Sequence, residues 1–254
     1  MEKAIIFDDN CPMCRLYTKG FVKMGLLKEE QRLGNSGLAD EAITTRVDPQ
    51  RARHEIPLVD LQGGETLYGV DALLELLGSK SRAIRYLGSV RWVKMVLYRL
   101  YAFISYNRRI VVPTPADRWE LMDFEPQFHA RWRLLFLAVV FGLVGALHVT
   151  AVGTLKWSVV AGVAVQIGLV AAHLRHKRTP NYWEHLLDYT GHLGMSLLPA
   201  AVLLSIALPF GWTGLAVAGV ALSIWQHYLR TQILGLSPWL TVIFAGIYFA
   251  LMLT

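Results

Sequence analysis

Five long apolar stretches dominate the second half of this chain and constrain its fold more than any other feature. A helix needs about 20 apolar residues to cross a bilayer, and the last two stretches are near the short limit. Glycine is frequent in them, as in helices that pack closely in lipid. The pattern predicts an all-α bundle of about five transmembrane helices rather than a soluble helical bundle. The stretches are residues 134–153, 157–174, 193–212, 213–229 and 238–254.

The chain divides into two parts of different composition. Residues 1–112 carry the ordinary charge of a soluble α/β domain, residues 113–130 form a linker, and residues 131–254 form the apolar part. The net charge is +6, but no basic run is sustained and no nucleic-acid-binding motif is present. This argues against nucleic acid as a partner and favours a lipid bilayer.

The first part begins with an apolar triplet, residues 5–7, which leads through a polar turn into a C-x-x-C motif. The motif contains the only two cysteines of the chain, Cys11 and Cys14, and a helix-compatible segment follows at residues 15–27. This order places Cys11 at a helix N-terminus, where free N–H groups and the helix dipole favour a thiolate. Pro12 suits the first turn of such a helix. Thiols in C-x-x-C sites have pKa values of roughly 3.5–7.5, so Cys11 is the candidate nucleophile and Cys14 the resolving thiol.

Other interpretations of the motif stay open. A zinc site would need ligands from elsewhere, such as His54, because no further cysteine is present. The two cysteines could also be unreactive. Asp8 beside them would raise a thiol pKa and could accept a proton during resolution, whereas Asp9 or Asn10 could cap the helix.

The rest of the first part predicts further strands and one helix. We expect strands at residues 42–47, 58–61 and 66–68, with Gly63-Gly64 as a hairpin signal between the last two. A helix is expected at residues 70–77. Together with Pro57 just before the third strand, this is the order of elements in thioredoxin.

Three blocks of this part resemble the DCC family of thiol–disulfide oxidoreductases, a thioredoxin-like group. The resemblance covers roughly residues 1–112 and implies a thioredoxin-like fold, dithiol chemistry at Cys11 and Cys14, and a functional Asp8. It further implies a cis peptide bond before Pro57, whose preceding carbonyl would face the disulfide; the alternative is an ordinary edge-strand proline. Family members often carry Gly in place of Asp9. The blocks are Asp8-x-x-Cys11-x-x-Cys14, Tyr68-Gly69-Val70-Asp71-Ala72-Leu73-Leu74 and Tyr98-x-x-Tyr101-x-x-Ile104-x-x-Asn107-Arg108-Arg109.

Two features concern the bilayer. Apolar residues between Trp92 and Ile104 recur at helical spacing among basic residues, which predicts an amphipathic helix that packs on the soluble domain or lies on an anionic membrane. Basic residues precede the first apolar stretch and follow the second and the fourth, while the alternate loops carry only Lys156. The positive-inside rule then predicts a cytoplasmic N-terminus and an external C-terminus in an integral protein of a bacterial-type inner membrane.

Histidines and carboxylates gather near the predicted cytoplasmic ends of the apolar stretches. Imidazole and carboxylate suit a metal and paired histidines suit haem, so the cluster could bind a metal, a haem or a quinone head group. The alternative is that these side chains lie above the hydrocarbon and bind nothing. The residues are His173, His176, Glu184, His185, Asp188, His192 and His227.

The function expected from these observations is that of a membrane-anchored thiol–disulfide oxidoreductase with its dithiol in the cytoplasm. Its substrates would be protein or small-molecule disulfides and thiols, and a reducing compartment would favour work as a reductant or relay. Two alternatives stay open. One is a metal-, haem- or quinone-binding membrane protein whose first domain recruits or regulates; the other is a membrane scaffold with an inactive thioredoxin-like fold.

Overall fold

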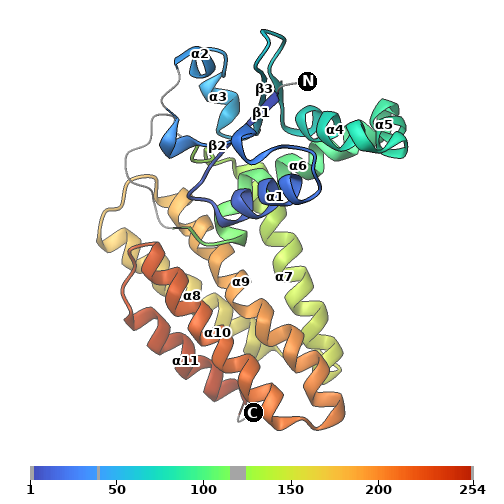
Figure 1. The fold of residues 1–254 in the computed structure, drawn as a ribbon. Coiled ribbons are helices and arrows are strands. Elements are labelled where there is room, and N and C mark those ends of the chain that lie inside the picture. The colour runs from blue at the N-terminus through green and yellow to red at the C-terminus, as the bar shows by residue number, and fades with distance from the viewer. Residues whose placement is uncertain (1–2, 39–40, 115–123, 253–254) are drawn as a thin grey trace. The chain divides into compact units, whose positions relative to one another are not determined.

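The computed structural model describes residues 3–38, 41–114 and 124–252, and it divides into two compact units, Met1–His129 and Ala130–Thr254 (Figure 1). The predicted linker lies partly outside the described residues. Helices dominate both units. Unit 1 contains β1 (Lys3–Phe7), α1 (Pro12–Lys23), η1 (Glu29–Gln31), β2 (Arg32–Gly34), η2 (Asn35–Gly37), α2 (Glu41–Thr44), α3 (Pro49–Ala52), β3 (Pro57–Asp60), β4 (Leu67–Tyr68), α4 (Gly69–Lys80), α5 (Arg82–Ser89) and α6 (Arg91–Val111).

A small mixed sheet forms the centre of unit 1, with strand order β2-β1-β3-β4. β1 pairs parallel with β2 and antiparallel with β3, and β3 pairs antiparallel with β4. Successive side chains of a strand point to opposite faces, and both faces of β1 are buried. Ile5 and Phe7 join one core cluster, whereas Ile6 joins a second cluster on the other side. The end of β1, from which the cysteine turn departs, is therefore fixed from both faces.

The expected strand at residues 42–47 is absent from the sheet, because its first residues belong to the short helix α2 and residues 45–47 form a turn after it. The parallel partner of β1 is instead β2, which ends at Gly34. A Cβ atom at Gly34 would lie 2.8 Å from Oδ2 of Asp9, so the missing side chain lets the two turns approach. Asp9 accepts hydrogen bonds from the backbone N–H and the hydroxyl of Ser36. Its predicted role as the helix cap is therefore wrong, and the N-cap residue is Cys11.

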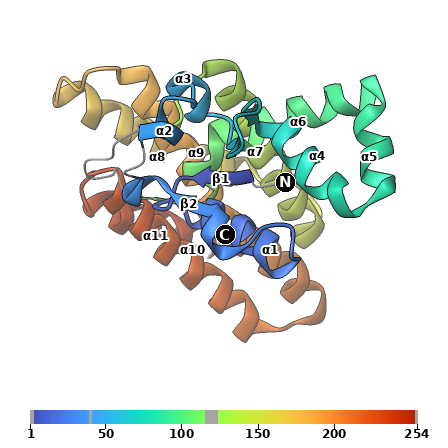
Figure 2. The same ribbon diagram turned by 45° about the horizontal axis from the view of Figure 1, so that its top comes forward.

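The helices of unit 1 follow the sequence pattern more closely. The predicted helix at 70–77 is found within α4, and α4, α5 and α6 pack against one another (Figure 2). The end of α6 is buried and includes Asn107 and Arg108. Its beginning exposes apolar side chains, among them Trp92, 67% exposed, and Met95, 50% exposed. The amphipathic helix thus joins the core of unit 1 by its last turns, while its first turns leave an apolar face uncovered.

Unit 2 is a helical bundle. α9 packs against α7, α8 and α10 (Figure 1), and Gly194 lets α7 approach, since a Cβ there would lie 2.8 Å from Val140. Pro199 interrupts the helical hydrogen-bonding pattern of α9, and Ser223 of α10 accepts a hydrogen bond from the following N–H, that of Ala200. The elements are α7 (Ala130–Val152), α8 (Trp157–His176), α9 (Tyr182–Ala207), η3 (Leu208–Phe210), α10 (Thr213–Ile233) and α11 (Trp239–Met252).

The predicted fold class, an α/β thioredoxin-like domain joined to about five transmembrane helices, is wrong. The structure is 73% helical, and its strands, of 5, 3, 4 and 2 residues, do not make a wide sheet. Among the described residues, 3 helices are long and apolar enough to span a membrane: Ala130–Val152, Trp157–His176 and Tyr182–Phe210. α10 carries Gln226, His227 and Arg230 near its end, and α11 has only 14 residues, fewer than a bilayer core requires.

Candidate dithiol site

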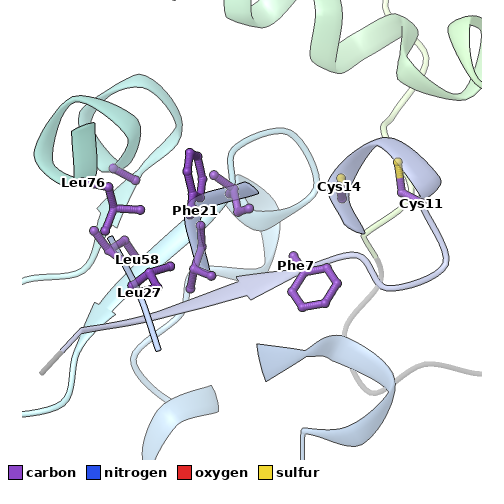
Figure 3. Close-up of a cluster of buried hydrophobic side chains, with 10 residues drawn as sticks. Phe7, Cys11, Cys14, Phe21, Leu27, Leu58 and Leu76 are labelled. Carbon is purple, nitrogen blue, oxygen red and sulfur yellow. The ribbon is translucent and has the colours of Figure 1, made fainter. Parts of the chain in front are cut away.

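The two cysteines lie at the beginning of α1, where β1 ends. Cys11 is the N-cap residue, Pro12 follows at the first helical position, and Cys14 is one turn further along. Both are free thiols and both belong to the core cluster that includes Phe7. Figure 3 shows their sulfur atoms on the side of the helix away from Phe7. This arrangement brings both sulfurs to one end of α1, as the C-x-x-C spacing predicts.

The two thiols differ in acidity because one donates a hydrogen bond to the other. The side chain of Cys14, and secondarily its backbone N–H, lower the pKa of Cys11 from 9.0 to about 6, although burial opposes the change. The same hydrogen bond, together with burial, raises the pKa of Cys14 well above its ordinary value. Near neutral pH the proton therefore stays on Cys14 while Cys11 is a thiolate, the form that attacks disulfides.

A buried ion pair stands beside the thiols. Asp8 accepts a hydrogen bond from the backbone N–H of Cys11 through Oδ1, at 3.1 Å, and pairs with Arg108 Nη2 through Oδ2, at 3.2 Å. The carboxylate thus fixes the turn that presents Cys11, although its charge raises the pKa of that thiol. The positive charge of Arg108 acts in the opposite direction and favours the thiolate.

Arg108 is held in place by backbone oxygens from distant parts of unit 1. Its guanidinium donates to the carbonyl of Arg53, at 3.0 Å, and to that of Phe124. Sequence reasoning quoted Arg108 only within the third family block and gave it no role at the site. Only that block pointed to Arg108, because its partner Asp8 lies 100 positions away in the sequence and no local spacing connects the two.

A cavity of about 270 Å³ opens beside Cys14 within unit 1. Asp8, Arg108 and Pro57 also line it, and most of its remaining wall is apolar. Burial raises the pKa of Tyr101, another lining residue, to about 12, so its hydroxyl stays neutral and accepts a hydrogen bond from the N–H of Ile56, at 3.0 Å. The cavity suits an apolar group next to the resolving cysteine.

Pro57 lies where the sequence predicts, at the beginning of β3, and lines this cavity together with Cys14. The predicted cis bond is not found, since no peptide bond is cis among the residues that the structure describes. Its ring needs no N–H partner, so the ordinary reason for a proline at a strand's first residue applies. The structure therefore brings Cys11, Cys14, Asp8 and Pro57 together but does not give Pro57 the expected conformation.

The predicted metal-binding residues do not form a cluster. In the described parts of the chain, no group of three or more His, Cys, Asp or Glu side chains could hold a metal ion. Asp188 pairs with Arg133, at 3.2 Å, and His192 lies 3.1 Å from Arg230. His227 is buried between hydroxyl groups, and the remaining four, His173, His176, Glu184 and His185, are at least partly exposed.

His54, the other ligand considered, is likewise engaged in a contact of its own. Its ring stacks on Tyr106 with centroids 4.3 Å apart, and burial lowers its pKa. It belongs to no candidate metal group with Cys11 and Cys14. The zinc interpretation of the C-x-x-C motif therefore has no support from the described residues.

No family model, curated protein or solved structure matches the chain.

Proposed function

We propose that the protein is a membrane-anchored thiol–disulfide oxidoreductase in which Cys11 is the nucleophile and Cys14 the resolving cysteine. The observation that carries this proposal is the placement of two free thiols one turn apart at the beginning of α1, beside the buried pair of Asp8 and Arg108. The resemblance of the three sequence blocks to the DCC family adds to it, because the site contains residues of the first and third blocks.

The proposed reaction is a two-electron exchange. The thiolate of Cys11 attacks one sulfur of a substrate disulfide, forms a mixed disulfide and displaces the other sulfur as a thiolate. Cys14 then loses its proton and attacks the sulfur of Cys11, which releases the second substrate thiolate. The substrate disulfide is reduced to two thiols, which take the proton of Cys14 and one from solvent, and Cys11 and Cys14 are oxidised to a disulfide. A second thiol compound restores the dithiol by the reverse exchange.

Asp8 and Arg108 have positioning roles in this proposal. Asp8 orients the turn through the N–H of Cys11, and Arg108 neutralises the carboxylate and favours the thiolate. Cys11 itself is 0% exposed, so the chain around it must open locally before a substrate sulfur can reach it. Apolar substrate groups would then fit the cavity beside Cys14.

We further propose that unit 1 lies in the cytoplasm. Arg131 and Arg133 stand at the beginning of α7, and Arg175, Lys177 and Arg178 stand around the end of α8, so the same side of the first two candidate spans carries the basic residues. The expected external C-terminus stays a prediction, since an odd number of spans, five or three, places it on the side opposite unit 1. Reporter fusions before α7 and between α7 and α8 test this; a reporter before α7 that is active only outside the cytoplasm contradicts it.

Mixed-disulfide trapping tests the reaction. Full-length Cys14→Ala protein, incubated with oxidised glutathione, should accumulate glutathione on Cys11, detected by mass spectrometry of the intact chain. The matched control, Cys11→Ala, keeps only the less acidic thiol and should react far more slowly. Equal modification of the two variants, or none in either, contradicts the assigned roles and leaves an inactive scaffold as the better description.

A further inference from the structure

A second cavity, of about 480 Å³, lies within unit 2 and is lined by α7, α8, α9 and α11. Its wall is mostly aliphatic, with aromatic rings from Phe141, Phe244 and Tyr248. Cavities of this size accommodate small organic molecules, and apolar walls with a few polar groups are typical of ligand sites. A lipid-soluble molecule is the expected ligand of such a cavity between candidate membrane spans.

One polar side chain in this wall is completely buried and incompletely hydrogen-bonded. Gln166, midway along α8, is 1% exposed. Its Nε2 donates both of its protons, to the hydroxyl of Tyr189 at 3.0 Å and to the carbonyl oxygen of Leu240 at 2.9 Å. Its Oε1 has no hydrogen-bond partner among the residues that the structure describes. A buried carbonyl without a donor is unfavourable, so the site is complete only when a ligand supplies one.

The identity of the two amide atoms follows from the partners. The carbonyl oxygen of Leu240 accepts hydrogen bonds but cannot donate them, so the atom of Gln166 that faces it must be the nitrogen. Neither Leu240 nor Tyr189 lines the cavity, although Gln166 does. The amide thus uses its nitrogen on the protein side, which leaves the acceptor oxygen for the cavity.

A chain of hydrogen bonds behind Gln166 fixes this orientation. The Tyr189 hydroxyl accepts from Gln166 and so has its single proton free for Nε2 of His227, at 2.9 Å. Nδ1 of His227 then carries the ring proton and donates it to the hydroxyl of Thr241, at 2.9 Å. The same imidazole stacks on Phe244, with ring centroids 4.2 Å apart. The chain therefore positions the amide acceptor and one aromatic wall of the cavity together.

We propose that this cavity binds a lipid-soluble aromatic hydroxyl compound of the quinol type, whose O–H donates a hydrogen bond to Oε1 of Gln166. The aromatic lining suits a flat ring, and the surrounding aliphatic residues suit its substituents. Ordered water is the competing donor; it needs two to four polar partners, and the lining offers His148, Lys156 and Tyr248 besides Gln166, so the comparison of ligands below decides between water and ligand. This inference is independent of the dithiol reaction and involves neither Cys11 nor Cys14.

The test compares two ligands with the same ring, one with hydroxyl protons and one with methyl groups in their place. The full-length protein in lipid nanodiscs is titrated with durohydroquinone under anaerobic, reducing conditions and, separately, with its dimethyl ether, and binding is followed by isothermal calorimetry. We expect the hydroquinone to bind about tenfold more tightly than the ether, the difference that one satisfied buried acceptor makes. Equal affinities, or no binding of either compound, overturn the proposal, and this comparison needs no variant.

A substitution locates the acceptor. Gln166→Met keeps the length of the side chain and removes the amide, so the hydroquinone should lose its advantage over the ether while the ether binds as before. Gln232→Met, at an exposed position of α10 outside the cavity, is the matched control and should keep the full difference. Preference for the hydroquinone that survives Gln166→Met in folded protein assigns the hydroxyl to another partner and overturns the proposal.

Discussion

The low pKa of Cys11 depends most on the thiol of Cys14, and removing that thiol should change it measurably. The decrease from 9.0 to about 6 corresponds to about 4 kcal/mol of preference for the thiolate, at about 1.36 kcal/mol per pKa unit. At pH 7 it makes about 90% of Cys11 ionised, against about 1% of a thiol with a pKa of 9.0. In Cys14→Ala the backbone N–H of residue 14 remains, so we expect a pKa between these two values, at least about one unit above wild type.

The ultraviolet absorption of the thiolate, recorded against pH in the reduced full-length protein, measures this pKa. Cys11→Ser protein provides the baseline, because it contains every tyrosine but not the titrating thiolate. Cys14→Ser is the matched control: its hydroxyl still donates a hydrogen bond, so its midpoint should stay closer to wild type than that of Cys14→Ala. A wild-type midpoint near 9.0, or one that Cys14→Ala leaves unchanged, would refute the account of the site.

Three further predictions concern stability. Because the folded pKa of Cys11 lies below its ordinary value, the reduced protein should become more stable as the pH rises from about 6 to 9, by at most about 4 kcal/mol, and lose this stability as the pH falls through 6. Urea unfolding of the reduced protein at several pH values measures the change. The same pH dependence in Cys11→Ser would contradict this account. Arg108→Met leaves the buried carboxylate of Asp8 without its partner and should lower the free energy of unfolding by about 3–5 kcal/mol. Lys94→Met breaks a more exposed pair with Asp71 and should lower it by less than about 1 kcal/mol. Equal losses in the two variants would contradict the argument from burial. Gly194→Ala should lower stability in detergent by about 1–3 kcal/mol because its Cβ meets α7 at 2.8 Å, while Gly142→Ala, with nothing within 4 Å, should not; matching melting temperatures would argue against this close packing.

Local chemistry made the beginning of unit 1 predictable. Pro12 suits the first helical position, and α1 begins there. Pro57 and the Gly63-Gly64 turn indicated β3 and β4, which were found beside each other. The segment 42–47 misled because Ile43 of a short helix and Val47 of the turn after it both pack into a core, which periodicity over so few residues cannot distinguish from a strand.

The number of spans and the polar contacts in unit 2 were predicted less well, because the composition of a stretch does not show which of its polar residues are buried. The stretch 213–229 is apolar by count, yet it contains His227 and its helix continues to Arg230, both of which are buried against polar partners in unit 2. Gln166 was overlooked although a single amide in the middle of an apolar stretch is itself an indication of function. The proposed histidine cluster failed because residues at neighbouring helix ends can face different helices, which sequence spacing does not reveal.

The acidity of Cys11 has a local cause, the thiol of Cys14, and a distant one, the charge of Arg108, and both favour the thiolate. At pH 7 a pKa of about 6 stabilises the reduced protein by about 1.4 kcal/mol relative to an ordinary thiol, which raises the potential of the two-electron couple by only about 30 mV. That change is small beside the range of about 150 mV that separates reducing from oxidising dithiol proteins. The hydrogen bond from Cys14 therefore makes Cys11 a competent nucleophile without deciding the direction of electron flow. The buried pair of Asp8 and Arg108 acts in the same sense, since the positive charge of Arg108 lowers the pKa of Cys11 by more than the carboxylate of Asp8 raises it. The site therefore makes Cys11 reactive, while the direction of electron flow in the proposed reaction is set by the reduction potential of the partner couple.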